Sequence, residues 1–168
     1  MAKKVAFCGM LCALAMIFSY VEALVPINFG IPGIKLGLAN LVVLFGLYRM
    51  APREILAVQV ARILLIGFMF GSGASIIYSL AGGLLSFAVM LILIRTGKFT
   101  SVGVSAAGGA AHNIGQIIVA MAVLRSGGLL YYLAVLMVSG VITGVVMGLL
   151  GERIMATVEQ GDGSSFHG

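Results

Sequence analysis

The residues of this sequence that could bind a ligand are the few polar and ionisable side chains inside long apolar segments. Arg62, His112 and Glu22 stand out among them. An ionisable side chain at membrane depth is costly and tends to face a bundle interior or a cavity, so each is a candidate site residue. The remaining candidates are mostly uncharged polar residues: Asn40, Tyr78, Ser79, Asn113, Gln116 and Lys35.

The chemistry that these residues could perform is binding. Arg62 and His112 could orient an anionic or polar small molecule, and the amides and hydroxyls could supply hydrogen bonds. His112 and Gln116 are four residues apart and share a helical face, which Asn113 borders. A structural interpretation stays open, in which Glu22 pairs with Arg62 and His112 is a helix-packing donor. An acid or base role for His112 is weakest, because Glu22 is the only carboxylate that could lie at comparable depth.

Other kinds of site lack the residues that they require. The chain has five acidic residues, and its single aspartate, Asp162, lies in the polar C-terminal stretch. Aspartate-rich magnesium sites and paired-acid hydrolysis therefore have almost nothing to build on. Cys8 and Cys12 have no nearby ligands to complete a metal site, and no phosphate-binding P-loop is present. The sequence thus predicts no catalytic residues, no metal and no cofactor.

Membrane helices must position the candidate residues. Of the 168 residues, 61% are hydrophobic and 9% are charged, whereas soluble domains have about 25% charged residues. This composition excludes a soluble globular protein and predicts an all-α integral membrane protein. The apolar runs predict a compact bundle of about six helices, over residues 5–25, 36–50, 53–70, 74–94, 102–124 and 129–150. The second is short, and a re-entrant segment is the alternative.

The basic residues predict the orientation of these spans. With the N-terminus inside, two Lys or Arg residues lie outside, Lys35 and Arg125, and seven lie on the cytoplasmic side: Lys3, Lys4, Arg49, Arg53, Arg95, Lys98 and Arg153. The positive-inside rule then favours both termini inside. Membrane topology therefore explains the net charge of +5 without a nucleic-acid partner.

The polar candidates are unevenly distributed in depth. At about 1.5 Å per residue, Arg62 and His112 lie near the midplane, and the other candidates lie between the midplane and the outer surface. This asymmetry predicts a cavity that opens to the outside and has its floor near the midplane. The segment Pro26–Lys35 holds two of the three prolines and is too apolar for a solvated loop, so we expect it to cover the cavity as a lid.

We expect one transmembrane domain over residues 1–153 and a polar, flexible tail over residues 154–168. A retained first helix is preferred to a cleaved signal peptide, because no clear cleavage site precedes Pro26. Small residues at four-residue spacing permit close helix approach. They occur in the last predicted helix as Gly140, Gly144 and Gly148, and in the first as Ala2, Ala6, Gly9 and Ala13. The face on the first helix either packs within the bundle or docks another membrane protein.

Three strings resemble one bacterial family: Pro32-Gly-Ile-Lys-Leu-Gly-Leu-Ala-Asn40, Tyr78-Ser-Leu-Ala-Gly-Gly-Leu-Leu-Ser86 and His112-Asn-Ile-Gly-Gln116. This is the Gx transporter family, also called heptaprenyl diphosphate synthase component I, and the resemblance extends to about residue 153. The family is in turn similar to the S-components of energy-coupling factor transporters. Those are six-helix membrane proteins with an outward-facing pocket, a capping loop after helix 1 and a small-residue face on helix 1 that docks an energising module.

The resemblance implies a substrate-binding subunit of a small-molecule uptake transporter in the bacterial cytoplasmic membrane. Its expected partners are a small-molecule substrate, the lipid bilayer, and a transmembrane scaffold with ATPase subunits docking on Ala6, Gly9 and Ala13. The alternative is a non-catalytic membrane component associated with heptaprenyl diphosphate or quinone synthesis, or with flavin-based electron transfer. Prenyl diphosphate synthases hold magnesium and diphosphate with aspartate-rich motifs, so with its single aspartate this chain cannot be the catalytic synthase.

Overall fold

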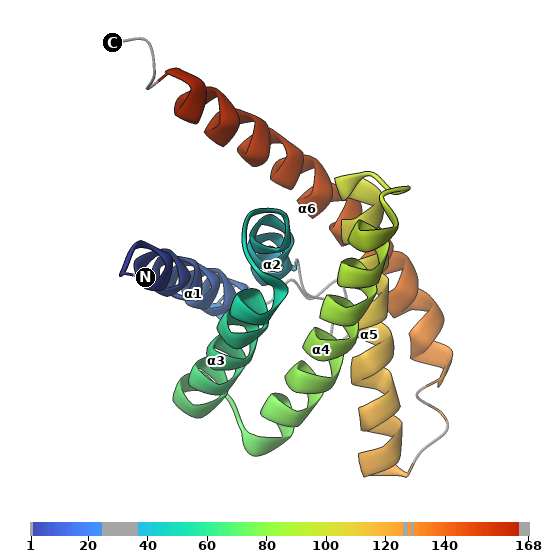
Figure 1. The fold of residues 1–168 in the computed structure, drawn as a ribbon. Helices are drawn as coiled ribbons and strands as arrows, with labels where there is room; N and C mark the ends of the chain where they lie inside the picture. The colour runs from blue at the N-terminus through green and yellow to red at the C-terminus, as the bar shows by residue number, and fades with distance from the viewer. Residues whose placement is uncertain (1, 25–36, 126–127, 129, 165–168) are drawn as a thin grey trace.

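The computed structural model describes residues 2–24, 37–125, 128 and 130–164, and within these ranges it contains helices and no strand. The helices are α1 (Ala2–Leu24), α2 (Leu38–Arg49), α3 (Pro52–Phe70), α4 (Gly73–Thr96), α5 (Ser101–Leu124) and α6 (Leu130–Ser164) (Figure 1). Four of them, α1, α4, α5 and α6, are long and apolar enough to cross a membrane. The predicted fold class, an all-α membrane bundle, is therefore confirmed.

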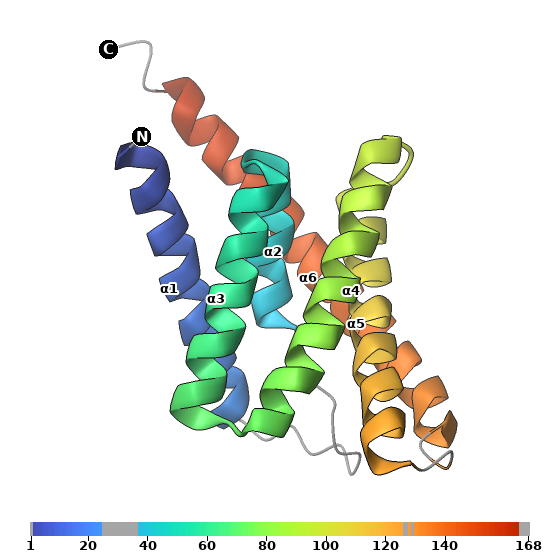
Figure 2. The same cartoon turned by 60° about the horizontal axis from the view of Figure 1, so that its bottom comes forward.

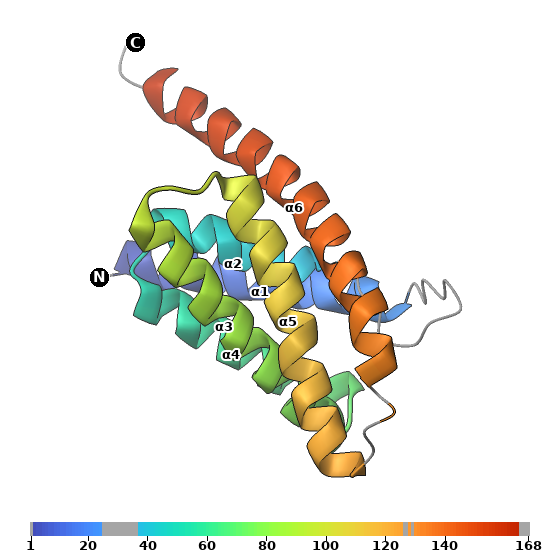
Figure 3. The same ribbon diagram turned by 90° about the vertical axis from the view of Figure 1, so that its right-hand side faces the viewer.

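Successive helices alternate in direction along the bundle. The N-terminus and the α2–α3 and α4–α5 connections lie at one end, and the α3–α4 connection lies at the other end, as Figure 2 shows. This up-and-down order is the one that six consecutive spans require. Figure 3 shows α4, α5 and α6 side by side, with α6 extending well past its neighbours toward the C-terminus.

The two remaining helices are less typical of membrane spans. α3 has 19 residues and carries Arg53, Glu54 and Arg62. α2 has 12 residues, or about 18 Å at 1.5 Å per residue, which is shorter than a hydrocarbon core of about 30 Å. It contacts each of the other five helices, and its side chains Val43 and Leu44 are almost completely buried. A helix that is apolar on all sides suits this central position.

Local sequence signals set the helix boundaries. Pro52 occupies the first turn of α3, where its missing N–H costs nothing. The Ser72 hydroxyl accepts a hydrogen bond from the Ser75 backbone N–H at 3.2 Å and caps α4. Gly97 ends α4 with φ of 65°, a left-handed conformation that glycine adopts without strain. The predicted boundaries of α2 to α5 accordingly lie within two residues of the observed ones.

Small residues bring α5 and α6 into close contact. A Cβ atom on Gly144 would lie 2.6 Å from the Cα atom of Ala106, and one on Gly148 would lie 2.6 Å from the Cα atom of Val102. These distances leave no room for a side chain, so the helix backbones touch. The close packing predicted for the glycine series of this helix is confirmed.

α6 is longer than the sequence suggested. It continues through Ser164, so the residues from 154 to 164, predicted as a flexible tail, are helical. No proline interrupts them. The change to polar composition ends the membrane crossing but not the helix. Glu159 of this extension pairs with Arg49 of α2 at 3.8 Å. Just before the extension, Glu152 accepts a hydrogen bond from Ser101 Oγ at 2.6 Å.

Candidate functional site

A cavity of about 290 Å³ lies among the helices, and all six contribute to its wall. Gly71 and Ser75 place one end of the cavity near the α3–α4 connection, at the end of the bundle opposite the N-terminus. Ile63, Ile66 and Phe70 form an apolar side. Six of the nine predicted site residues line it: Glu22, Asn40, Arg62, Ser79, His112 and Asn113. The structure thus brings together most of the residues that depth and polarity had selected.

Arg62 reaches this cavity from the middle of α3. Its Nη1 donates a hydrogen bond to Ser19 Oγ of α1 at 2.9 Å, and its Nη2 donates to Gln59 Oε1 at 2.7 Å. Its Nε is buried and has no hydrogen-bond partner. Both partners are neutral, so they hold the guanidinium in place without compensating its charge.

Glu22 lies in the same wall but has a different role from the one considered for it. Its Oε1 accepts a hydrogen bond from the Leu38 backbone N–H at 2.8 Å, at the first turn of α2. A carboxylate is favourable at a helix N-terminus, where the backbone N–H groups are unpaired and the helix dipole is positive. The described contacts of Glu22 and Arg62 include no ion pair between them. The two groups therefore do not form the direct ion pair considered from the sequence, but the Glu22 carboxylate lies near enough to interact electrostatically with the guanidinium.

A set of buried polar side chains lies beside the cavity. Ser86 Oγ of α4 donates a hydrogen bond to Asn40 Oδ1 of α2 at 3.3 Å. Gln59 is completely buried, and a Cβ atom on Gly83 would lie 2.7 Å from its Nε2. The missing side chain of Gly83 thus makes room for the Gln59 amide. Sequence reasoning overlooked Gln59, although it lies three residues before Arg62, a spacing that places it on the same helix face.

The three predicted site residues on α5 lie in two different places. His112 and Asn113 line the cavity. Asn113 Nδ2 also donates a hydrogen bond to the Leu136 backbone carbonyl of α6 at 2.5 Å, so this amide joins two helices. Gln116 packs where α4 meets α5: a Cβ atom on Gly82 would lie 2.8 Å from its Cγ. Gln116 is therefore outside the cavity wall as described.

Two further predicted site residues fall elsewhere. Tyr78 is half-buried on α4 and is not among the residues that line the cavity. Lys35, together with the expected Pro26–Lys35 lid, lies outside the described residues. The structure adds three hydroxyls that the sequence analysis did not select, those of Ser19, Ser75 and Thr143. Ser19 could have been found, because it lies one helical turn before Glu22.

A family model for heptaprenyl diphosphate synthase component I matches residues 11–154. The chain belongs to this family. The matched range includes every described residue of the cavity wall. No curated protein and no solved structure matches the chain. With its long apolar helices, this member of the heptaprenyl diphosphate synthase component I family is a membrane-embedded protein.

Proposed function

We propose that this family member is the substrate-binding membrane subunit of a small-molecule uptake system that is energised by partner subunits. The observation that carries the proposal is the Arg62 guanidinium, which neutral partners hold in the wall of a cavity between six helices. Glu22 of the same wall interacts with this charge only at a distance and makes no direct ion pair with it. A charge at membrane depth without a directly bonded carboxylate is expensive, and such residues mark binding sites and transport pathways. Here the cation is available to an anionic or strongly polar group of a ligand.

The size and lining of the cavity support a small ligand. Its volume of about 290 Å³ lies just below the usual range for ligand pockets, which begins at roughly 300 Å³. Ile63, Ile66 and Phe70 would cover the apolar part of such a molecule. His112, Asn40 and the surrounding hydroxyls would orient its polar part. A heptaprenyl chain is far too long to be enclosed in this volume.

The outer face of α1 supports docking of an energising partner. Ala6, Gly9 and Ala13 are all exposed, whereas Leu11 and Ala15 of the same helix are buried. A Cβ atom on Gly9 would meet nothing within 4 Å. Small residues that face the lipid allow a second helix to approach closely. A transmembrane scaffold carrying ATPase subunits could dock here, and ATP hydrolysis would take place on those subunits.

In this proposal the chain performs no catalysis. Glu22 is the one carboxylate among the described residues of the cavity wall, and it is already bonded to the start of α2. Neither acid–base chemistry nor hydrolysis by paired carboxylates has a second acidic group to use in this wall.

A second candidate function follows from the family description, which points to heptaprenyl diphosphate synthesis. The chain would then be a non-catalytic membrane component associated with heptaprenyl diphosphate or quinone synthesis, or with flavin-based electron transfer. This candidate places the partner surface on the basic cytoplasmic loops. It also predicts that substitutions of Arg62 and His112 are tolerated.

Affinity purification of the tagged protein from its native host in gentle detergent distinguishes the two candidates. Mass spectrometry would identify both the proteins and the small molecules that co-purify. The uptake proposal expects a membrane scaffold with ATPases, or a bound polar metabolite. Recovery of a soluble prenyl synthase or redox partner, with an empty cavity, would contradict it.

A further inference from the structure

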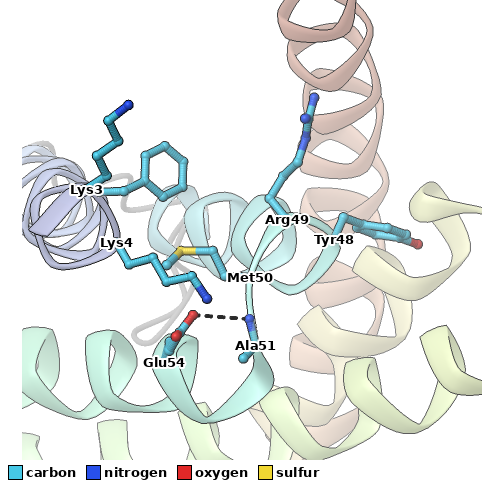
Figure 4. Close-up of a pocket in the computed structure, with 8 residues that line it drawn as sticks. Lys3, Lys4, Tyr48, Arg49, Met50, Ala51 and Glu54 are labelled. Atoms are coloured by element: carbon cyan, nitrogen blue, oxygen red, sulfur yellow. Dashed lines mark hydrogen bonds between the residues drawn. The ribbon is translucent and has the colours of Figure 1, made fainter. Parts of the chain in front are cut away.

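A second and larger cavity, of about 640 Å³, lies at the opposite end of the bundle. It is an open groove between the N-terminal turns of α1 and the α2–α3 connection (Figure 4). We call it the headgroup groove, and the residues that line it are Lys3, Lys4, Phe7, Tyr48, Arg49, Met50, Ala51 and Glu54. None of them belongs to the cavity around Arg62.

The groove carries more positive than negative charge. Lys3 and Lys4 are exposed, and the described contacts give neither of them an ion pair or hydrogen bond. Arg49 points toward α6, where it pairs with Glu159 at 3.8 Å. The one lining carboxylate is Glu54, whose Oε2 accepts a hydrogen bond from the Ala51 N–H at 3.3 Å. The groove therefore carries two unpaired ammonium groups: Figure 4 shows Lys4 directed toward Glu54 and Lys3 extending away from it. Both side chains are long and exposed, so both can turn toward an anion.

Apolar side chains lie next to these cations. Phe7 and Met50 line the groove and pack against the buried core of the bundle. Lys4 directly precedes the apolar run of α1 that begins at Val5. Tyr48, an amphipathic residue of the kind enriched at membrane interfaces, completes the wall. Cations next to apolar side chains are the arrangement expected where lipid headgroups meet the hydrocarbon core.

We propose that the headgroup groove binds the phosphate headgroup of an anionic phospholipid. Lys3 and Lys4 contact the phosphate, and Phe7 and Met50 contact the glycerol and the first acyl carbons. Basic pockets at the cytoplasmic ends of membrane helices attract anionic headgroups in this way. Glu54 weakens the interaction, because its carboxylate points toward Lys4 in the same space. This inference uses none of the residues of the uptake proposal, so a failure of either one leaves the other unaffected.

Native mass spectrometry of the full chain in detergent tests the proposal, with dioleoylphosphatidylglycerol and dioleoylphosphatidylcholine as probes. We expect bound phosphatidylglycerol to exceed bound phosphatidylcholine. Each basic residue near the membrane surface contributes roughly 1 kcal/mol to lipid binding, and 1.4 kcal/mol corresponds to about a tenfold change in affinity. The double variant Lys3→Gln/Lys4→Gln should therefore weaken phosphatidylglycerol binding by about thirty-fold. The matched control Arg95→Gln/Lys98→Gln removes two charges from the same end but outside the groove, and should bind as the wild type does.

A gain of binding separates the proposal from simple loss of folding. Glu54→Gln keeps an oxygen that can accept the Ala51 N–H bond but removes the negative charge, so phosphatidylglycerol binding should strengthen about fivefold. Equal retention of the two lipids, or equal losses in the two double variants, would overturn the proposal. Inorganic phosphate that displaces phosphatidylglycerol at millimolar concentration would also overturn it, because the site would then serve a soluble anion.

Discussion

The Arg62 guanidinium donates a hydrogen bond to the Ser19 hydroxyl at 2.9 Å and thereby joins α3 to α1 in the wall of the cavity. The second anchor, Gln59 Oε1, lies on α3 itself at 2.7 Å. The two neutral anchors fix the direction of the guanidinium, and the nearest opposing charge, the Glu22 carboxylate, acts on it only at a distance without a direct ion pair. This arrangement suits a residue that binds a ligand better than one that only holds helices together, because packing would be served by apolar side chains.

Replacing the arginine and its anchor by apolar residues should preserve the fold. Arg62→Met alone leaves the buried Gln59 amide oxygen without its hydrogen-bond donor, which should lower the free energy of unfolding by about 1–3 kcal/mol. The double variant Gln59→Leu/Arg62→Met removes both polar groups and should unfold at the wild-type temperature or above it. Thermal unfolding in detergent, monitored by circular dichroism, gives the order of stability of the wild type and the two variants. A double variant that is less stable than Arg62→Met would show that the pair holds the bundle together.

Glu22 should stabilise α2 through its N-terminus. Glu22→Ala removes the acceptor of the Leu38 N–H bond and should lower the free energy of unfolding by about 1 kcal/mol. Glu22→Gln keeps an acceptor oxygen and loses only the interaction of the charge with the helix dipole, so its effect should be smaller. Denaturant titrations of both variants in the same detergent give the comparison. Equal losses in the two variants would argue against the capping role.

Two glycine positions should respond in opposite ways to the same substitution. Gly144→Ala places a methyl group 2.6 Å from the Ala106 Cα atom and should destabilise the protein by about 1–3 kcal/mol. A Cβ atom on Gly9 would meet nothing within 4 Å, so Gly9→Ala should be neutral or stabilising, as alanine is in a helix interior. Differential scanning fluorimetry of the two variants measures the change in unfolding temperature at each position. A loss at Gly9 equal to the loss at Gly144 would contradict the described packing of α1.

A larger residue at Gly9 should block partner docking without affecting stability. Gly9→Leu fills the smooth face formed with Ala6 and Ala13, and should abolish co-purification of a membrane scaffold while the unfolding temperature stays unchanged. Gly73→Leu is a matched control, because a Cβ atom there also meets nothing within 4 Å but the residue lies on α4. Quantitative mass spectrometry of the captured proteins compares the variants. Equal capture of a scaffold by Gly9→Leu and the control would exclude this face as the docking site.

The order and depth of the helices could be predicted from the sequence, because in a membrane they depend on runs of apolar residues. Depth along each helix placed Arg62 and His112 near the midplane and Asn40 nearer the outer surface, and all three line the cavity. The prediction of the cavity succeeded because a polar group at that depth is costly unless it faces polar neighbours or water.

The rotation of each helix could not be predicted in the same way. His112 and Gln116 share a helix face and both pack against Gly82 where α4 crosses α5, yet only His112 is among the described residues that line the cavity. Glu22 was considered as the partner of Arg62, but its carboxylate bonds to the start of α2 instead. Such choices depend on which helices are neighbours, and a single sequence does not contain that information.

The occupancy of the cavity tests the central claim most directly. Wild-type protein, Arg62→Ala and the exposed control Arg153→Ala would be purified in parallel from the native host, and the small molecules released on denaturation would be quantified by mass spectrometry. Our account predicts one polar metabolite at near-stoichiometric levels in the wild type and in Arg153→Ala, and its loss from a folded Arg62→Ala protein. Equal amounts of the metabolite in all three proteins, or none in the wild type, would contradict the assignment of Arg62 as the residue that binds the substrate.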